Sequence, residues 1–254
     1  MTSPNLPRPS PDWAYFLDVD GTLLDIVERP NASRVSPGLR RLLAGLDDIT
    51  GGALALITGR SVADIDRLFA PSTFCVAGQH GAERRGADGR LHRQRLPDER
   101  LRKAEHTLRR MVVAHPDLVL EDKGMSLALH YRSAPELGAE VRKIMRGVLE
   151  DVGEEFEMLT GKMVVEIKPG GRDKGTAIAE FMKEPPFRSR MPVFIGDDVT
   201  DEFGFELVNQ IGGHCVKVGE GGSAAHLRLP HAGAVRAWLG EIANQGRQPG
   251  DAVS

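Results

Sequence analysis

Apolar positions along the chain follow two periods. Short apolar, β-branched runs are typical of buried strands, and apolar residues recurring every three or four positions are typical of amphipathic helices. Over the first third, this predicts strands at residues 13–20, 53–60 and 74–83, with helices between them at 36–50 and 61–70. Ser residues stand at both helix starts. Strands alternating with helices indicate βαβ units and a parallel sheet.

The pattern changes at about residue 85 and returns after Pro169. Between them, two helical stretches alternate with paired short strands, which predicts an α+β segment with a mainly antiparallel sheet. We therefore expect an α/β fold, in which residues 1–84 and 170–254 form a Rossmann-like parallel-sheet core and residues 85–169 form an inserted α+β cap domain. The last ten residues are polar and rich in Gly and Pro, so we expect them to be frayed.

Composition limits the classes of function. The formal net charge of −3 argues against nucleic-acid binding, because such domains are usually strongly basic. The two cysteines, Cys75 and Cys215, form no CxxC pair, which excludes a disulfide framework and disfavours structural zinc. The amino-terminal residues lack an apolar signal-peptide region, and no apolar run approaches a membrane span. We expect a cytoplasmic monomer without membrane contact.

Two pairs of aspartates follow apolar strands. Asp18 and Asp20 lie at the end of the first predicted strand, and Asp197 and Asp198 follow the apolar residues 193–195. The carboxyl ends of parallel strands meet at one edge of a sheet, where α/β proteins place their chemistry. Neighbouring carboxylates repel one another unless a cation lies between them. The spacing therefore predicts a Mg²⁺ site, completed by water and substrate phosphate.

Two further residues offer parts for phosphoryl transfer. Thr58 ends another strand, and its hydroxyl and the neighbouring backbone N–H groups are suited to hold phosphate oxygens. Lys174 begins a helix, where a cation is disfavoured unless an anion is near. Asp18 is then a candidate nucleophile that forms an aspartyl-phosphate, and Asp20 is a candidate general acid and base.

Other interpretations of these residues remain open. Gly21 is the fourth residue of its loop, whereas a calcium-binding EF-hand needs Gly at the sixth. Asp197, Asp198 and Asp201 could instead cap a helix, and Thr58 could cap a turn. Lys174 could be a solvated lysine of a first helical turn. It precedes a glycine rather than following one, which disfavours a Walker A loop.

Taken together, these motifs resemble those of the haloacid dehalogenase superfamily of phosphotransferases. The matching residues are DxDGT at 18–22, Thr58, Lys174 and GDDxxD at 196–201. The resemblance implies that Asp18 is the nucleophile and Asp20 the acid/base. It implies a metal held by Asp18, the backbone carbonyl of Asp20, and Asp197, with Asp198 and Asp201 as supporting residues.

The expected cap carries charged residues on alternating strand positions. Carboxylates accept hydrogen bonds from sugar hydroxyls and cations donate to them, so this set suits a sugar. A solvated strand face with salt bridges is the plainer alternative. The residues are Glu121, Lys123, Arg132, Lys162 and Glu166.

Three segments sharpen this expectation. GQHGAE at 78–83, LEDKGMSLALHYR at 120–132 and GKMVVEIKP at 161–169 are similar to the trehalose-6-phosphate phosphatase family. This resemblance implies Mg²⁺-dependent hydrolysis of trehalose 6-phosphate. It implies that the five cap residues contact the disaccharide. The further substrate-binding residues that we expect are Gly59, Arg60, Gln79, His80 and Gly81.

The cap alone would distinguish several related activities. A phosphatase for sucrose phosphate or mannosylglycerate phosphate would share the core chemistry, and so would a phosphomutase. A carbohydrate-phosphate sensor without turnover is a further alternative. The presence of every expected catalytic group disfavours the sensor.

Overall fold

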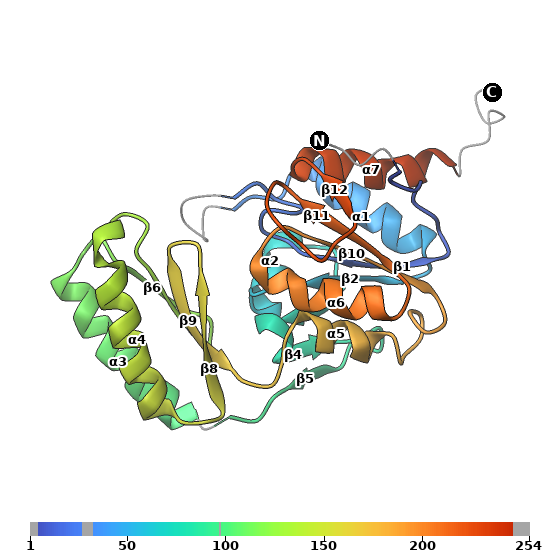
Figure 1. Cartoon of the computed structure of the whole chain (residues 1–254). Helices are drawn as coiled ribbons and strands as arrows, with labels where there is room; N and C mark the ends of the chain where they lie inside the picture. The colour runs from blue at the N-terminus through green and yellow to red at the C-terminus, as the bar shows by residue number, and fades with distance from the viewer. Residues whose placement is uncertain (1–4, 27–32, 97, 246–254) are drawn as a thin grey trace. The chain divides into compact units, whose positions relative to one another are not determined.

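The computed structural model describes residues 5–26, 33–96 and 98–245. The chain divides into two compact units, one formed by Met1–His92 and Asp173–Ser254 and the other by Arg93–Arg172 (Figure 1). Most of the carboxyl-terminal tail that we expected to be frayed lies outside the described residues. No described helix combines the length and the apolar character needed to span a bilayer.

The first unit is built on an eight-stranded sheet with the order β12-β11-β10-β1-β2-β3-β4-β5. The strands from β12 to β3 are parallel, as predicted, and β4 runs antiparallel to β3. Their bounds are β1 Trp13–Leu17, β2 Leu54–Ile57, β3 Cys75–Gly78, β4 Glu83–Arg85, β5 Leu91–Arg93, β10 Met191–Gly196, β11 His214–Val218 and β12 Leu227–Leu229.

Helices cover both faces of this sheet (Figure 1). Along β1, Tyr15 and Leu17 belong to an apolar cluster with α1, α2 and α7, whereas Ala14 and Phe16 join a cluster with α5 and α6. The side chains of Ser36 and Ser61 cap α1 and α2 as predicted. The helices are α1 Pro37–Ile49, α2 Val62–Phe69, α5 Lys174–Phe181, α6 Glu202–Gln210 and α7 Ala232–Gln245, with 3-10 turns η2 Gln79–Gly81 and η4 Val199–Asp201.

We expected one strand within residues 84–96 and assigned it to the insert. The structure has two strands in this region, β4 and β5. Both lie in the first unit's sheet. A tight turn, in which Gly89 has φ +74° and its N–H donates to the Gly86 carbonyl at 3.0 Å, folds β5 back along β4. Arg85 forms an ion pair with Asp66 that fixes β4 against α2. The second unit therefore begins later than residue 85.

The second unit has its own sheet and core. All neighbouring strands of the sheet β6-β7-β9-β8 are antiparallel. Leu129 and Val165 pair across it and point into an apolar cluster shared with α3 and α4. Ala128 and Glu166 pair on the opposite face. The elements are α3 Asp98–Ala114, β6 Val119–Asp122, β7 Leu127–His130, η3 Pro135–Leu137, α4 Gly138–Val152, β8 Phe156–Gly161 and β9 Val164–Pro169.

Candidate active site

A buried ion-pair cluster lies at the carboxyl end of β1. The Lys174 ammonium donates to Oδ1 of Asp18 at 2.8 Å and to Oδ1 of Asp201 at 2.6 Å. Asp18 is 4% exposed, Lys174 3% and Asp201 0%. Helix α5 begins at Lys174 and thus places a cation against two carboxylates. The sequence predicted an anion near this lysine, and the structure has one there.

Asp201 also shapes the loop after β10. Its Oδ2 accepts the backbone N–H groups of Asp197 and Asp198, each at 2.9 Å. The helix-capping alternative for this aspartate is therefore correct in part, because Asp201 organises the turn while binding Lys174. The hydroxyl of Thr22 donates to Oδ1 of Asp197 at 3.5 Å, which ties the two acidic motifs together.

Burial sets the electrostatics of the cluster. Burial raises the pKa of Asp18 and nearby Asp201 adds to this, whereas Lys174 opposes the shift. Burial and the neighbouring Asp201 carboxylate raise the pKa of Asp197 to about 6. Burial alone would lower the pKa of Lys174, but the facing carboxylates of Asp18 and Asp201 raise it overall. Two ammonium groups, those of Lys174 and Lys217, do not balance the four carboxylates of Asp18, Asp197, Asp198 and Asp201, so the site favours a further cation.

The donor set fits a hard divalent cation. Carboxylate oxygens of Asp18, Asp197 and Asp201 lie within 4.8 Å of one another. Among the described residues, no hydrogen-bond partner reaches the buried Oδ2 of Asp18. Oxygen ligands of this kind are those that Mg²⁺ prefers.

Asp20 stands apart from this cluster and binds Arg60. The Arg60 guanidinium donates to both oxygens of Asp20, at 2.6 and 2.7 Å, and its Nη2 also donates to the Ser33 hydroxyl at 2.7 Å. A two-bond fork of this type fixes both orientation and charge. The structure thus brings the expected acid/base and an expected substrate-binding residue into direct contact.

The turn after β2 interlocks with the turn after β3. The Thr58 hydroxyl accepts the Arg60 N–H at 3.1 Å, and the Thr58 carbonyl accepts the N–H of His80 at 3.0 Å. The Gln79 N–H donates to the Arg60 carbonyl at 2.9 Å. A Cβ on Gly59 would lie 2.7 Å from Nε2 of His80, so a larger residue there would have to displace the His80 ring. Gly81, at φ +99°, completes the second turn.

Three residues of the first unit were missed in the sequence. Lys217, buried at the end of β11, donates to the Asp197 carbonyl. Ser33 binds Arg60, and Thr22, although part of the DxDGT motif, was given no role. The sequence signal for Lys217 was a lone lysine in the apolar strand HCVKV. No local sequence pattern marks Ser33.

The second unit gathers part of the expected sugar-binding set. Lys123 donates to Oε2 of Glu166 at 2.9 Å, and Ser126 donates to its Oε1 at 2.6 Å. Glu121 lies 3.0 Å from Nε2 of His130. Arg132 and Lys162 are exposed, the first after β7 and the second between β8 and β9. Ser126 and His130 were not predicted.

Known proteins match most of the chain. The family model described as trehalose-phosphatase matches residues 16–228. The chain belongs to this family. A probable trehalose-phosphate phosphatase of Sinorhizobium fredii is 44% identical over 236 residues, covering 91% of this chain and 88% of the relative. The trehalose-6-phosphate phosphatase of Escherichia coli is 43% identical over 241 residues, covering 94% and 90%.

A solved structure supports the same assignment. The crystal structure of a trehalose-6-phosphate phosphatase related protein superposes with a TM-score of 0.75 at 28% identity, covering 91% of this chain and 97% of that one. The predicted α/β fold and the predicted family are confirmed, and it is a family of phosphoric monoester hydrolases.

Proposed function

We propose that this chain hydrolyses trehalose 6-phosphate to trehalose and phosphate through an aspartyl-phosphate intermediate. The observation that carries the proposal is Asp18 at the end of β1, held through one oxygen by Lys174 while the other has no described partner. A nucleophile needs one oriented carboxylate oxygen left available. The names of the two relatives supply the substrate.

We propose Mg²⁺ as the cofactor, held by Asp18, Asp197 and the Asp20 backbone carbonyl. Asp198 and Asp201 would support the ligands from behind. When bound, the ion would neutralise charge on the transferring phosphoryl group. The clustered carboxylate oxygens support this choice.

In the first step, Asp18 would attack phosphorus while the bond to the sugar oxygen breaks. Thr58 and backbone N–H groups would hold the phosphoryl oxygens, and Lys174 would fix the nucleophile. Asp20 would give its proton to the leaving sugar oxygen. Because both Asp20 oxygens are held by Arg60, that guanidinium has to shift before Asp20 can donate.

In the second step, Asp20 would take a proton from water, whose oxygen attacks phosphorus. The bond from phosphorus to Asp18 then breaks, which releases phosphate and restores both aspartates. Arg60 is placed to hold Asp20 as a carboxylate at this stage. The two steps balance without any other reactant.

We propose that the first unit is the catalytic core and that the second is the cap that selects the sugar. Glu166, with Lys123 and Ser126 already bound to it, would be the centre of the sugar-binding face. Gly59, Arg60 and the 79–81 turn would contribute from the core. The monomeric state and the cytoplasmic location remain predictions.

The test compares Asp18→Asn with Asp12→Asn, a change of the same chemistry at an exposed residue. We expect phosphate release from trehalose 6-phosphate to fall about 10⁴-fold or more in the first and to stay unchanged in the second. Melting curves of both variants verify folding. Full activity of Asp18→Asn would refute the assignment of Asp18 as the nucleophile.

Substrate choice needs a separate measurement. The kcat/KM for trehalose 6-phosphate is compared with that for sucrose, mannosylglycerate and glucose phosphates. A much higher value for another substrate would overturn the specificity. In ¹⁸O-labelled water, label in the released phosphate is expected, whereas its absence would favour a phosphomutase.

A further inference from the structure

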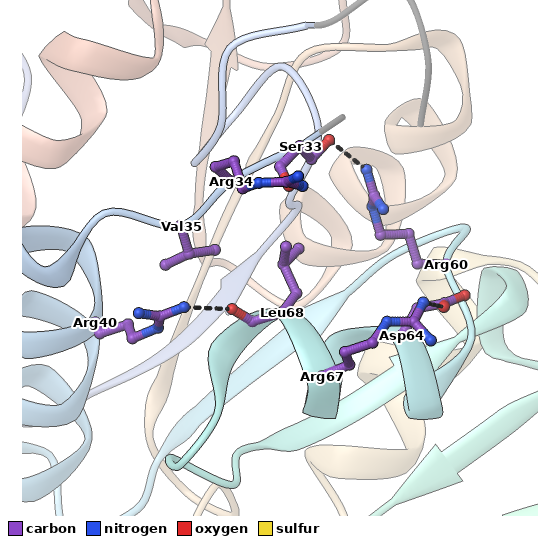
Figure 2. Close-up of a pocket in the computed structure, with 8 residues that line it drawn as sticks. All are labelled: Ser33, Arg34, Val35, Arg40, Arg60, Asp64, Arg67 and Leu68. Carbon is purple, nitrogen blue, oxygen red and sulfur yellow. Dashed lines mark hydrogen bonds and ion pairs between the residues drawn. The ribbon is translucent and has the colours of Figure 1, made fainter. Parts of the chain in front are cut away.

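A pocket of about 480 Å³ opens in the first unit beside α1 and α2. Its lining carries four guanidinium groups and one carboxylate, that of Asp64 (Figure 2). Two of these guanidinium groups are paired with carboxylates, Arg60 with Asp20 and Arg67 with Asp64. The four residues are Arg34, Arg40, Arg60 and Arg67.

Arg40 has a hydrogen-bond donor left over. Its Nη2 donates to the Leu68 carbonyl at 3.2 Å. Its buried Nε meets no acceptor among the residues that the structure describes. A buried donor without a partner costs free energy, which a bound acceptor would recover.

Arg67 is engaged only weakly. It pairs with Asp64 at the surface, where 74% of its side chain is exposed. Exposed ion pairs contribute little to stability, so an incoming anion can replace this one. Arg34 donates to the Ser33 carbonyl at 3.1 Å, and Arg60 donates to the Ser33 hydroxyl at 2.7 Å. Figure 2 shows this last bond at the upper rim of the pocket.

We propose that this pocket binds a small molecule carrying a phosphate group, at a site distinct from the acidic cluster. Guanidinium groups match the geometry of phosphate oxygens, and the buried Nε of Arg40 and the exposed Arg67 offer donors to such a group. Val35 and Leu68 give the pocket an apolar wall for an organic part. Arg60 connects the pocket with Asp20, because it binds that carboxylate as well as Ser33.

Calorimetric titration tests the site without turnover, so the outcome does not depend on the proposed function. The probes are pyrophosphate and glycerol 3-phosphate, used with a chelator present, since the acidic cluster without a divalent ion repels anions. Binding is measured for the unmodified chain, Arg40→Gln, Arg67→Gln and Arg188→Gln. Arg188 is exposed and lies outside the pocket lining, so its variant controls for net charge.

We expect at least one probe to bind the unmodified chain and Arg188→Gln with equal affinity. Arg40→Gln and Arg67→Gln should each weaken that binding about tenfold or more, as for loss of a charge-assisted hydrogen bond. Arg67 is exposed, so its variant is expected to fold even if Arg40→Gln does not. The stronger probe shows whether the site prefers a polyphosphate or an ester. Absence of binding by both probes, or equal affinity across the four proteins, would overturn the proposal.

Discussion

Gly21 illustrates how closely the acidic site is packed around its backbone. It has φ +88°, a conformation that side-chain-bearing residues rarely adopt, and a Cβ there would overlap the Asp197 carboxylate. The glycine of the DxDGT motif therefore serves two needs, a left-handed turn and room for an acidic side chain from another strand. The second need is invisible in the sequence, because Asp197 is 176 residues away.

Comparing a substitution at Gly21 with one at Gly89 separates the need for positive φ from the need for space. We expect Gly21→Ala to displace Asp197 and to lower phosphatase activity about 100-fold or more. Gly89→Ala is the matched control, since Gly89 also has positive φ but has nothing within 4 Å of its Cβ position. The control should lose about 1 kcal/mol of stability to backbone strain and keep its activity. Activity assays and thermal melts of both variants check this, and equal activities would contradict it.

Residues that the sequence motifs assigned to one site lie close together in the structure. Asp18, Lys174 and Asp197 lie together because strand ends and helix starts meet at one edge of a parallel sheet. The pairing of Asp20 with Arg60 was not foreseen, although both were named. Such a contact depends on side-chain direction and on the packing of Ser33, which no local pattern specifies.

Individual elements show a similar limit. The caps of α1 and α2 followed from serine and proline placement, since capping is a local interaction. The assignment of β5 to the insert was wrong, because strand partners depend on how a turn folds. Residues 84–96 predict a strand equally well in either sheet, and only the turn at Gly86–Gly89 decides.

Helix α1 ends unfavourably, with Asp47 and Asp48 in its last turn and no basic residue there. The helix dipole disfavours anions at this end. Burial, and then the neighbouring Asp48 carboxylate, raise the pKa of Asp47. A carboxyl whose pKa is raised in the folded state stabilises that state while protonated, and this contribution is lost as pH rises through the folded pKa. At neutral pH, ionised Asp47 is therefore destabilising.

We accordingly expect Asp47→Asn to raise the free energy of unfolding at pH 7. The gain should shrink as pH falls toward the ordinary range of an aspartate, where the natural carboxyl is protonated in both states. Denaturant unfolding at several pH values measures it, with the exposed Asp12→Asn as control. A gain that stays constant between pH 4 and 8 would show that charge is not its origin.

At the scale of the whole molecule, the two units have separate apolar cores. The second unit is one continuous segment with a core formed by its own strands and helices. Its two ends meet, because the Gln94 side chain donates to the Gly170 carbonyl at 3.2 Å. A segment that leaves and re-enters a fold at neighbouring points is suited to insertion into a loop.

Residues 93–172 expressed alone should therefore fold. Eighty residues form a small domain, so we expect a cooperative but modest thermal transition rather than high stability. Circular dichroism and dispersed amide signals in NMR spectra would measure it. Leu129→Ala, which opens a cavity in the core, should abolish the transition, whereas Arg132→Ala at an exposed position should leave it unchanged. A fragment without a cooperative transition would mean that this core needs the rest of the chain to form, and the second unit would then not be an autonomous domain.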